Sequence, residues 1–391
     1  MNDFIGVLTG VRVLEICEGI AGPVCGQQLA DLGADVIKVE PPEGDRARTW
    51  GVTLADGQSA IFAHLNRGKR SVTCDVADEA GRAALKVLVD GADVIVVHQD
   101  PAQARALGWN WADIAVEAAP RIVCEITDLG PKGPFAGRAG SELTAQVLSG
   151  FSRYAGSAEA PARIGYEIAL VGTGMGAVQA VLAMLWQRDQ SGKGDYCAIS
   201  VLGHLLTQKQ ILLAAQTDPD AWEGFHLNGP HWAPDIGWQT KDGQVTFDFR
   251  HGQRDEWAGF CRAIGLSEIP EDPEYEDWRS TIYIGDRKDT HGGVYRNFFA
   301  RSTCAEARDK IVQSGGISVK FQDYAELLAN PQLEHLRPFV TVPKAAEGAK
   351  RQIATPFVFD GAEAGNPAPA PAPLQSDPTL AWTERKSAGA A

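Results

Sequence analysis

The stretch LTGVRVLEICEGIAGPVCGQQLADLGADVIKVEPPEGDRAR, residues 8–48, decides the fold of this chain. Its apolar run at Arg12–Cys17 predicts a short strand. The segment Gly22–Gly33 has apolar residues at helical spacing and ends in glycine, which predicts a helix. The following run, ADVIKVE, predicts a second strand, which Pro41 and Pro42 end. A strand, a helix and a strand in such close succession indicate the start of a parallel sheet with helices on its faces.

The same alternation continues through the first 200 residues. GRAALKVLVDGADVIVV, residues 81–97, predicts a further helix and strand, and Arg121–Ile126 predicts another strand. The rhythm breaks at residues 207–234, which are rich in Gln, Asn, Gly, Pro and Trp. After this break, a strand at Gly243–Phe249 and a helix at Asp255–Ile264 predict a smaller α+β domain. The segments PQLEHLRPFVTVP and TPFVFDG are expected to return in extended form to the first domain.

Length and composition narrow the class of protein. A chain of 391 residues, 44% hydrophobic and 22% charged, is typical of a globular protein with two domains. Its formal charge of −14 argues against nucleic acid and anionic membranes as partners. We expect no membrane-spanning segment, because no run of eighteen apolar residues occurs. The N-terminus lacks the features of a secretory signal.

Cysteine and histidine usage also carries information. The seven cysteines form no CxxC pair, which favours the reducing cytoplasm over a disulfide framework. His226 and His231 lie close together but have no third ligand nearby, so we expect no metal site.

The motif VGTGMGA, Val171 to Ala177, allows two interpretations. We expect the preceding EIAL to be a strand, and the motif then resembles a dinucleotide fingerprint with Asp195 as the ribose-binding acid. Such fingerprints usually open the first strand–helix–strand unit, however, and this one lies near the end of the domain. Close packing of a helix on small residues is therefore the favoured interpretation.

Other charged positions stay ambiguous on sequence alone. Arg67, Lys69 and Arg70 form either a solvated turn or a phosphate-binding patch. Glu142 follows a glycine-rich loop, and a carboxylate there is either a helix-capping group or a site acid. Glu167 has the same two interpretations.

Taken together, these segments resemble the class III coenzyme A-transferases, the carnitine-dehydratase and bile-acid-inducible-protein group. The opening stretch carries the strongest resemblance, through Ala21-Gly22-Pro23, Leu32-Gly33-Ala34-Asp35 and Gly44-Asp45. The resemblance continues through NRGKRS, ADVIVV, LGW, GPKGPFAGRAGSELTAQVLSG and RDQSGKGDYCAISVL, and more loosely through KDGQV, GGISV, NPQL and PFVFDG.

The resemblance implies an α/β fold with a Rossmann-like large domain built from both chain ends, plus a smaller α+β domain. It also implies an interlocked dimer. On this basis we expect a large domain over residues 1–202, a linker over 203–225, a small domain over 226–325, and a returning segment over 326–391 that completes the large domain.

The family chemistry uses an aspartate nucleophile, and this chain departs from it. The family places this aspartate five residues after the glycine matched by Gly165, where this chain has Leu170. Leucine offers no nucleophile, proton or charge. Of the nearby carboxylates, Glu167 would point differently on a strand, and Glu142 falls where relatives carry a second acidic residue. We expect no metal and no cofactor other than the coenzyme A thioester that is the substrate.

The resemblance also suggests which residues bind coenzyme A. The family's Asn-Phe-Arg-Pro-Gly loop is replaced by His98-Gln99-Asp100-Pro101-Ala102, and Arg105 is offset by one position from a family arginine. The expected coenzyme A-binding residues are Gly19, Ile20, Ala21, Arg48, Lys69, Cys74, His98, Gln99 and Arg105.

Three hypotheses about function follow. The leading one is a non-catalytic subunit of a heteromeric transferase, as in the succinyl-CoA:benzylsuccinate type, whose paralogous partner subunit carries the aspartate. The second is a self-sufficient transferase or acyl-CoA isomerase that uses Glu142 or Glu167. The third is a homodimer that binds acyl-CoA without turnover. The racemase branch is disfavoured, because Ser141 stands where it needs histidine.

The acyl donor and the acceptor acid cannot be identified from the sequence. Tryptophans around the linker, Trp222, Trp232 and Trp238, hint at an apolar or aromatic acid.

Overall fold

The computed structural model describes residues 6–117, 120–155, 160–210, 237–249, 253–283, 291–336, 338–356, 368–371 and 382. The chain divides into two compact units. The larger unit comprises Met1–Phe151, Ile164–Gln208 and Glu334–Ala391, and the smaller comprises Ser152–Arg163 and Lys209–Leu333. The predicted linker over 203–225 begins inside a helix that ends at Gln208, and its part from residue 211 onward lies outside the described residues.

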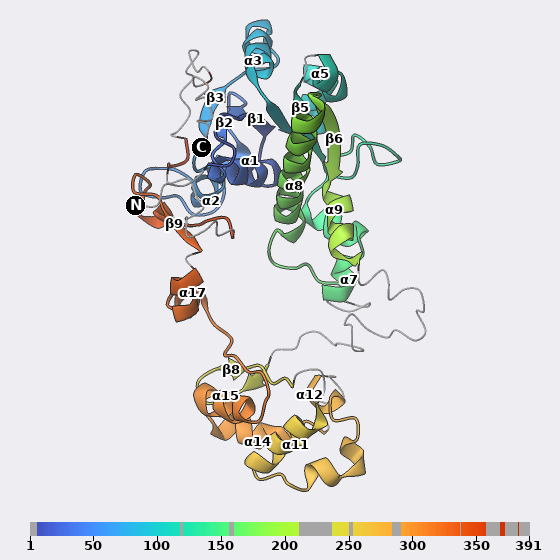
Figure 1. Ribbon diagram of the computed structural model, residues 1–391, viewed down its shortest axis with the longest axis vertical. Helices are drawn as coiled ribbons and strands as arrows, with labels where there is room; N and C mark the ends of the chain where they lie inside the picture. The colour runs from blue at the N-terminus through green and yellow to red at the C-terminus, as the bar shows by residue number, and fades with distance from the viewer. Residues whose placement is uncertain are drawn as a thin grey trace. The chain divides into compact units, whose positions relative to one another are not determined.

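A parallel sheet of six strands in the order β3-β2-β1-β4-β5-β6 forms the centre of the larger unit (Figure 1). The strands are β1 (Arg12–Cys17), β2 (Asp35–Glu40), β3 (Arg70–Thr73), β4 (Val94–His98), β5 (Ile122–Thr127) and β6 (Asp195–Ser200). This is the doubly wound, Rossmann-like order, in which the strand sequence reverses between β1 and β4. The predicted α/β fold is confirmed, and the strand predicted at Arg12–Cys17 has these bounds.

Helices cover both faces of this sheet, as alternation along the strands requires. Val13, Val94 and Val96 face one core with helices α1 and α8, whereas Leu14 and Ile95 face the other core with α3 and α5. The helices of this unit are α1 (Ala21–Asp31), α2 (Ala60–Leu65), α3 (Glu79–Gly91), α4 (Pro101–Leu107), α5 (Trp111–Glu117), α6 (Glu142–Leu148), α8 (Ile168–Ser191) and α9 (Val201–Gln208), with α7 (Phe151–Ala155) starting at its edge and the 3-10 turn η1 at Arg46–Thr49.

Helix α8 corrects one prediction. The segment EIAL, expected as a strand, is the beginning of this helix, and VGTGMGA lies inside it. Its glycines allow close packing: a Cβ on Gly174 would lie 2.5 Å from the Ala21 carbonyl oxygen of α1. Because the motif neither follows a strand nor forms a turn, it is no dinucleotide fingerprint, and helix packing explains its small residues.

Helix α8 is also the one helix among the described residues that is long and apolar enough to cross a membrane. It packs against α1, α9 and strands β5 and β6 in the larger unit. A helix in the core of a globular domain passes the same test of length and composition, so this feature alone is weak evidence for a membrane span.

The smaller unit has an aromatic core. Trp238 stacks on Phe299 with ring centroids 4.9 Å apart, and Trp257 stacks on Trp278 at 5.4 Å. Its main elements are β7 (Trp238–Gln239), β8 (Gln244–Val245), α11 (Arg254–Ala263), α12 (Ser280–Tyr283), α14 (Gly293–Arg301), α15 (Cys304–Gln313) and α16 (Tyr324–Leu328). The strand predicted at Gly243–Phe249 is thus reduced to two residues. Trp238 belongs to this core and gives no indication of an aromatic substrate, while Trp222, Trp232, His226 and His231 lie outside the described residues.

The returning segment is partly helical, contrary to the extended form expected. Asn330 accepts a hydrogen bond from the Gln332 backbone N–H at 2.9 Å, and Pro331 occupies the first helical position of α17 (Pro331–Leu336). A capping side chain followed by proline is a strong helix start. The chain then pairs β9 (Phe339–Thr341) with β10 (Arg351–Ile353) in an antiparallel ladder.

Candidate functional site

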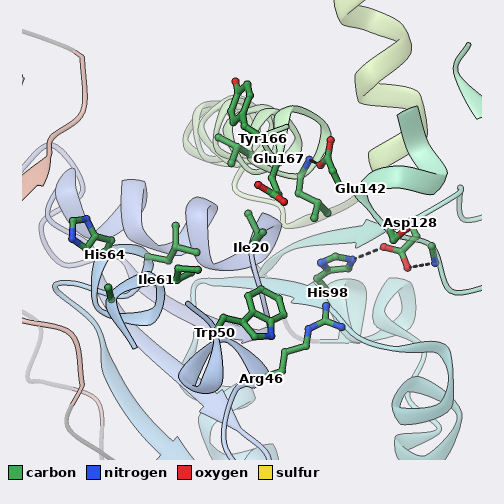
Figure 2. A pocket seen from close by; sticks show the side chains of 16 residues that line it. Ile20, Arg46, Trp50, Ile61, His64, His98, Asp128, Glu142, Tyr166 and Glu167 are labelled. Carbon is green, nitrogen blue, oxygen red and sulfur yellow. Dashed lines mark hydrogen bonds and ion pairs between the residues drawn. The ribbon is translucent and has the colours of Figure 1, made fainter. Parts of the chain in front are cut away.

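A pocket of about 780 Å³ opens in the larger unit, at the carboxyl ends of its central strands. Ile20 follows β1, His98 is the last residue of β4, and Asp128 directly follows β5. Ligands of doubly wound sheets bind at this edge, beside the point where the strand order reverses. The other lining residues are Arg46, Trp50, Ala60, Ile61, His64, Leu65, Gly140, Ser141, Glu142, Tyr166, Glu167, Leu170 and Val171 (Figure 2).

The first turn of α8 forms one wall of the pocket. Leu170 lines this wall, and its side chain packs against the hydrophobic core that α1 and α8 form on one face of the sheet. The neighbouring carboxylate of Glu142 is buried and accepts hydrogen bonds from the backbone N–H groups of Ala169 at 3.0 Å and Leu170 at 2.9 Å. Gln146 donates a third, at 2.8 Å. Glu142 therefore caps the positive end of a long helix with both of its oxygens.

Glu167 occupies the N-cap position of the same helix but makes no side-chain capping bond there. It is half-buried and lines the pocket, and Figure 2 shows its carboxylate extending from the helix end toward Ile20. The two glutamates singled out from the sequence thus differ. Glu142 is engaged by the start of the helix, and Glu167 presents a carboxylate to the pocket.

His98 and Asp128 form a pair on the next wall. His98 Nε2 lies 3.0 Å from Asp128 Oδ1, and Asp128 Oδ2 accepts a hydrogen bond from the Gly140 backbone N–H at 2.7 Å. Burial raises the pKa of Asp128, but the hydrogen bond and charge of His98 outweigh it and hold this pKa below its usual range. An ionised Asp128 keeps the proton on Nε2 of His98. Nδ1 of His98 is buried and has no hydrogen-bond partner among the residues that the structure describes.

The turn η1 and the residue after it, Trp50, form a third wall of the pocket. Asp45 caps it, accepting hydrogen bonds from the backbone N–H groups of Ala47 at 2.8 Å and Gly19 at 2.9 Å. The Gly19 backbone has φ +80° and lies against the side chains of Arg46 and Trp50, where a Cβ would come within 3.0 Å of the guanidinium. Glycine is therefore needed at position 19 for both conformation and space.

Of the residues expected to bind coenzyme A, Ile20 and His98 line this pocket together with Leu170, Glu142 and Glu167, and Gly19 lies at its edge. Gln99 is half-buried, Arg105 is exposed on α4, and Ala21 is buried at the start of α1. None of these three is part of the pocket lining.

The other three engage groups within the larger unit. Lys69 is buried, forms an ion pair with Glu15 at 2.7 Å, and donates to the Pro23 carbonyl oxygen. Arg48 binds Glu40 through two hydrogen bonds of 2.7 Å, and the Cys74 thiol donates to the Gly81 carbonyl oxygen. A coenzyme A contact by any of them stays a prediction.

Sequence reasoning missed Arg46, Trp50, Asp128 and Tyr166. Asp128 had a usable signal, since it directly follows a predicted strand and the carboxyl ends of parallel strands meet at one edge of the sheet. Arg46 had none, because nothing in GDRAR separates it from Arg48. Among the residues that the structure describes, no group of three or more His, Cys, Asp or Glu side chains could hold a metal ion.

Fold and pocket together define an α/β protein with a pocket at the switch point of a doubly wound sheet. The model of "CoA-transferase family III" matches residues 8–375, and the chain belongs to this family.

The chain is similar to succinyl-CoA:glutarate CoA-transferase of Mus musculus, with 33% identity over 279 residues that cover 70% of this chain. The match spans 63% of that relative's length. Succinate--glutarate CoA-transferase of Agrobacterium fabrum is 34% identical over 280 residues, which cover 68% of this chain and 69% of the relative. The crystal structure of the hypothetical protein Rv3272 from Mycobacterium tuberculosis matches with a TM-score of 0.77 and 25% identity, over 93% of this chain and 96% of that one.

Proposed function

We propose that this chain is a subunit of a class III CoA-transferase that moves coenzyme A between an acyl-CoA, such as succinyl-CoA, and a carboxylic acid. Membership of the family and the names of its relatives support this class of reaction. We assign this chain the non-catalytic role, in an interlocked heteromer whose paralogous subunit supplies the aspartate.

The chemistry of the family explains why one missing carboxylate is decisive. A carboxylate attacks the thioester carbonyl carbon, the C–S bond breaks, and the thiolate leaves while an enzyme-bound anhydride forms. The thiolate then attacks the enzyme carbonyl, the acyl carboxylate leaves, and an enzyme-bound thioester results. The acceptor acid reverses both steps. Each intermediate is a covalent derivative of one carboxylate, so a side chain without one cannot form them.

The first turn of α8 is the observation that carries the proposal. It presents Leu170 to the pocket at the position where the resemblance puts the nucleophile. The nearest substitute, Glu142, has both oxygens engaged by Ala169, Leu170 and Gln146. Freeing it would leave two buried N–H groups without an acceptor, which is costly.

The test measures coenzyme A transfer from succinyl-CoA, with hydroxylamine trapping of the enzyme-bound acyl group. The purified chain is assayed alone and mixed with a paralogue that carries the aspartate. We expect activity and trapping only in the mixture. Transfer by the chain alone would overturn the non-catalytic assignment.

A pair of variants tests whether Leu170 occupies the position of the nucleophile. Leu170→Asp is expected to bring thioester cleavage to the lone chain, whereas Val171→Asp, one residue further along the same pocket wall, is expected to leave it inactive. A lone chain that binds coenzyme A tightly yet stays inactive as Leu170→Asp would contradict the missing-nucleophile explanation.

Glu167 supports a second candidate, a self-sufficient transferase or acyl-CoA isomerase. Its carboxylate lines the same pocket and makes no capping bond to α8. Activity of the lone chain that disappears in Glu167→Gln at unchanged melting temperature would establish this alternative. Binding of acyl-CoA without transfer, alone and in the mixture, would instead identify an acyl-CoA-binding homodimer.

We also propose a cytoplasmic location. Among the described residues all seven cysteines are free thiols and six of them are buried, which suits a reducing compartment.

A further inference from the structure

Helix α2 forms one wall of the pocket but is too short to hold itself there. Its residues Ala60–Leu65 place Ile61, His64 and Leu65 on one face, and this face lines the pocket. In Figure 2, Ile61 and His64 lie on the side of the pocket away from Asp128. Helices shorter than about 12 residues are marginally stable by themselves, so the position of α2 depends on what packs against its other faces.

Another face of α2 packs against a segment from the far end of the chain. Phe62 is fully buried and forms a small apolar cluster with Ala47 and Ala370, against which Trp50 packs. Ala47 belongs to the turn η1, and Trp50 lines the pocket. Ala370 therefore belongs to the cluster that joins the α2 wall of the pocket to the η1 wall.

Hydrogen bonds fix the direction of this segment. The backbone N–H of Gly68, which follows α2, donates to the Ala368 carbonyl oxygen at 3.0 Å. The side-chain amide of Gln58, which precedes α2, donates to the Pro371 carbonyl oxygen at 3.1 Å. Residues 368–371, here called the Pro/Ala segment, therefore run along α2 from its carboxyl end to its amino end. An extended run of four residues is about 10–13 Å long, enough to pass a six-residue helix of about 9 Å.

The composition of the Pro/Ala segment suits this role. Proline and alanine alternate from Pro367 to Pro373. Proline restricts its own backbone and that of the preceding residue to extended conformations, so the segment loses little conformational entropy when it packs on the domain. The methyl group of Ala370 is small enough to enter the cluster around Phe62.

The chain has a second anchor beyond the Pro/Ala segment. The Trp382 indole N–H donates to the Leu88 carbonyl oxygen of α3 at 3.1 Å, and its ring lies 5.9 Å from the Arg12 guanidinium. Gly91 makes room for this ring, because a Cβ there would lie 2.4 Å from it. The end of the chain is thus attached to the larger unit at two places.

We propose that the Pro/Ala segment is a positioning element that holds α2 in place as a wall of the pocket, so that binding of acyl-CoA depends on it. The inference rests on the proposed binding of acyl-CoA and deepens it. A binding site pre-organised by a segment outside the pocket binds its ligand more tightly, because the wall need not be ordered when the ligand enters. Ala370 and Gln58 act through α2 and do not line the pocket themselves.

The test introduces a charge into the cluster. In Ala370→Glu a carboxylate replaces a buried methyl group, and since it cannot stay buried without a partner the segment must leave α2. Titration calorimetry of the full chain with succinyl-CoA measures binding without requiring turnover. We expect the affinity to fall by about 10-fold or more. Ala84→Glu, the same substitution on the exposed surface of α3, is the matched control and should bind like the wild type.

A milder variant protects the test against a failure to fold. Gln58→Met removes the hydrogen bond to Pro371 at nearly constant volume, and we expect a loss of affinity of about 2- to 5-fold. Circular dichroism and thermal melting identify which variants are folded at the temperature of the titration. If Ala370→Glu is unfolded, Gln58→Met decides by itself.

The outcomes separate this inference from the proposed function. Wild-type affinity in folded Ala370→Glu or, where that variant is unfolded, in Gln58→Met would overturn the positioning role and leave the proposed function standing. A purely structural contact would give that result, because it would lower the melting temperature without changing the affinity of the folded protein. No binding of succinyl-CoA by the wild-type chain would refute the acyl-CoA function itself.

Discussion

Charged side chains of the larger unit are used in two ways, some buried in its interior and others placed in the pocket walls. In the buried group, Lys38 pairs with Glu15 at 2.9 Å and with Asp45 at 2.7 Å, Lys69 pairs with Glu15 at 2.7 Å, and all four side chains are fully buried. In the pocket walls, Arg46 is exposed and has no such partner among the described residues. A buried charge must be neutralised within the chain, because leaving it unpaired costs several kcal/mol. A charge in an open pocket remains available to a ligand.

The buried group also supports the pocket. Asp45 holds the backbone of Gly19 and caps the turn that carries Arg46. Burial lowers the pKa of Lys38, but Glu15 and Asp45 outweigh it and raise this pKa above its ordinary value. Burial lowers the pKa of Lys69 as well, and there Glu15 does not fully compensate. Lys38 pairs with two carboxylates and Lys69 with one of them, so Lys38 is the cation on which the network depends most.

Lys38→Met should have the largest effect on stability. It leaves Asp45 without its lysine and Glu15 with only one, and we expect the free energy of unfolding to fall by about 3–5 kcal/mol. Chemical denaturation followed by tryptophan fluorescence measures the change. A variant as stable as the wild type would remove the distinction between a scaffold network and a ligand-binding charge.

The next largest effect is expected from acid, which should destabilise the fold by protonating the buried carboxylate of Glu40. Burial raises the pKa of Glu40, but Arg48, the Asp45 backbone N–H and Lys38 together lower it from 4.5 to about 2. Because the folded state has the lower pKa, the stabilisation is complete above about pH 4.5 and is lost as the pH falls toward 2. The loss is on the order of 3 kcal/mol.

Glu40→Gln provides the control for this prediction. Its stability should start lower at neutral pH and vary less between pH 4.5 and 2 than that of the wild type. Denaturation curves recorded at several pH values measure both effects. Parallel profiles for the two proteins would contradict the assigned role of Glu40.

The two glutamates of the pocket wall should respond differently to the same change. Glu142→Gln replaces one carboxylate oxygen with an NH₂ group, which then faces the backbone N–H of either Ala169 or Leu170, and we expect a loss of about 1.5–3 kcal/mol. Glu167→Gln removes no capping bond to α8, and we expect a smaller loss of stability than in Glu142→Gln. Melting temperatures of the two variants test this. A large loss of turnover in Glu142→Gln at unchanged melting temperature would show that Glu142 takes part in the chemistry.

Arg46→Met should have the smallest effect on stability, within about 0.5 kcal/mol, because the side chain is exposed and has no ion pair among the described residues. Arg48→Met is the matched variant in the same turn, and it should destabilise the protein clearly because it leaves Glu40 buried without its guanidinium. Equal melting temperatures for the two variants would mean that the two arginines are not distinguished as proposed.

The sequence alone determined the core of the fold. Strand β1, helix α1 and strand β2 follow from short apolar runs, a terminal glycine and two prolines, and these signals act within a few residues. Family membership follows from the same stretch. The position of Leu170 relative to Gly165 needed only counting along the chain.

Tertiary structure decided what each charged residue does. Glu142 and Leu170 are 28 positions apart, and only the folded chain brings that carboxylate to the start of α8. The same holds for His98 and Asp128, which meet because β4 and β5 end at one edge of the sheet. Arg46 and Arg48 are two positions apart and have the same side chain, yet Arg48 binds Glu40 and Arg46 lines the pocket. Whether a charge is neutralised depends on which partners the fold places around it, and no local pattern in the sequence records that.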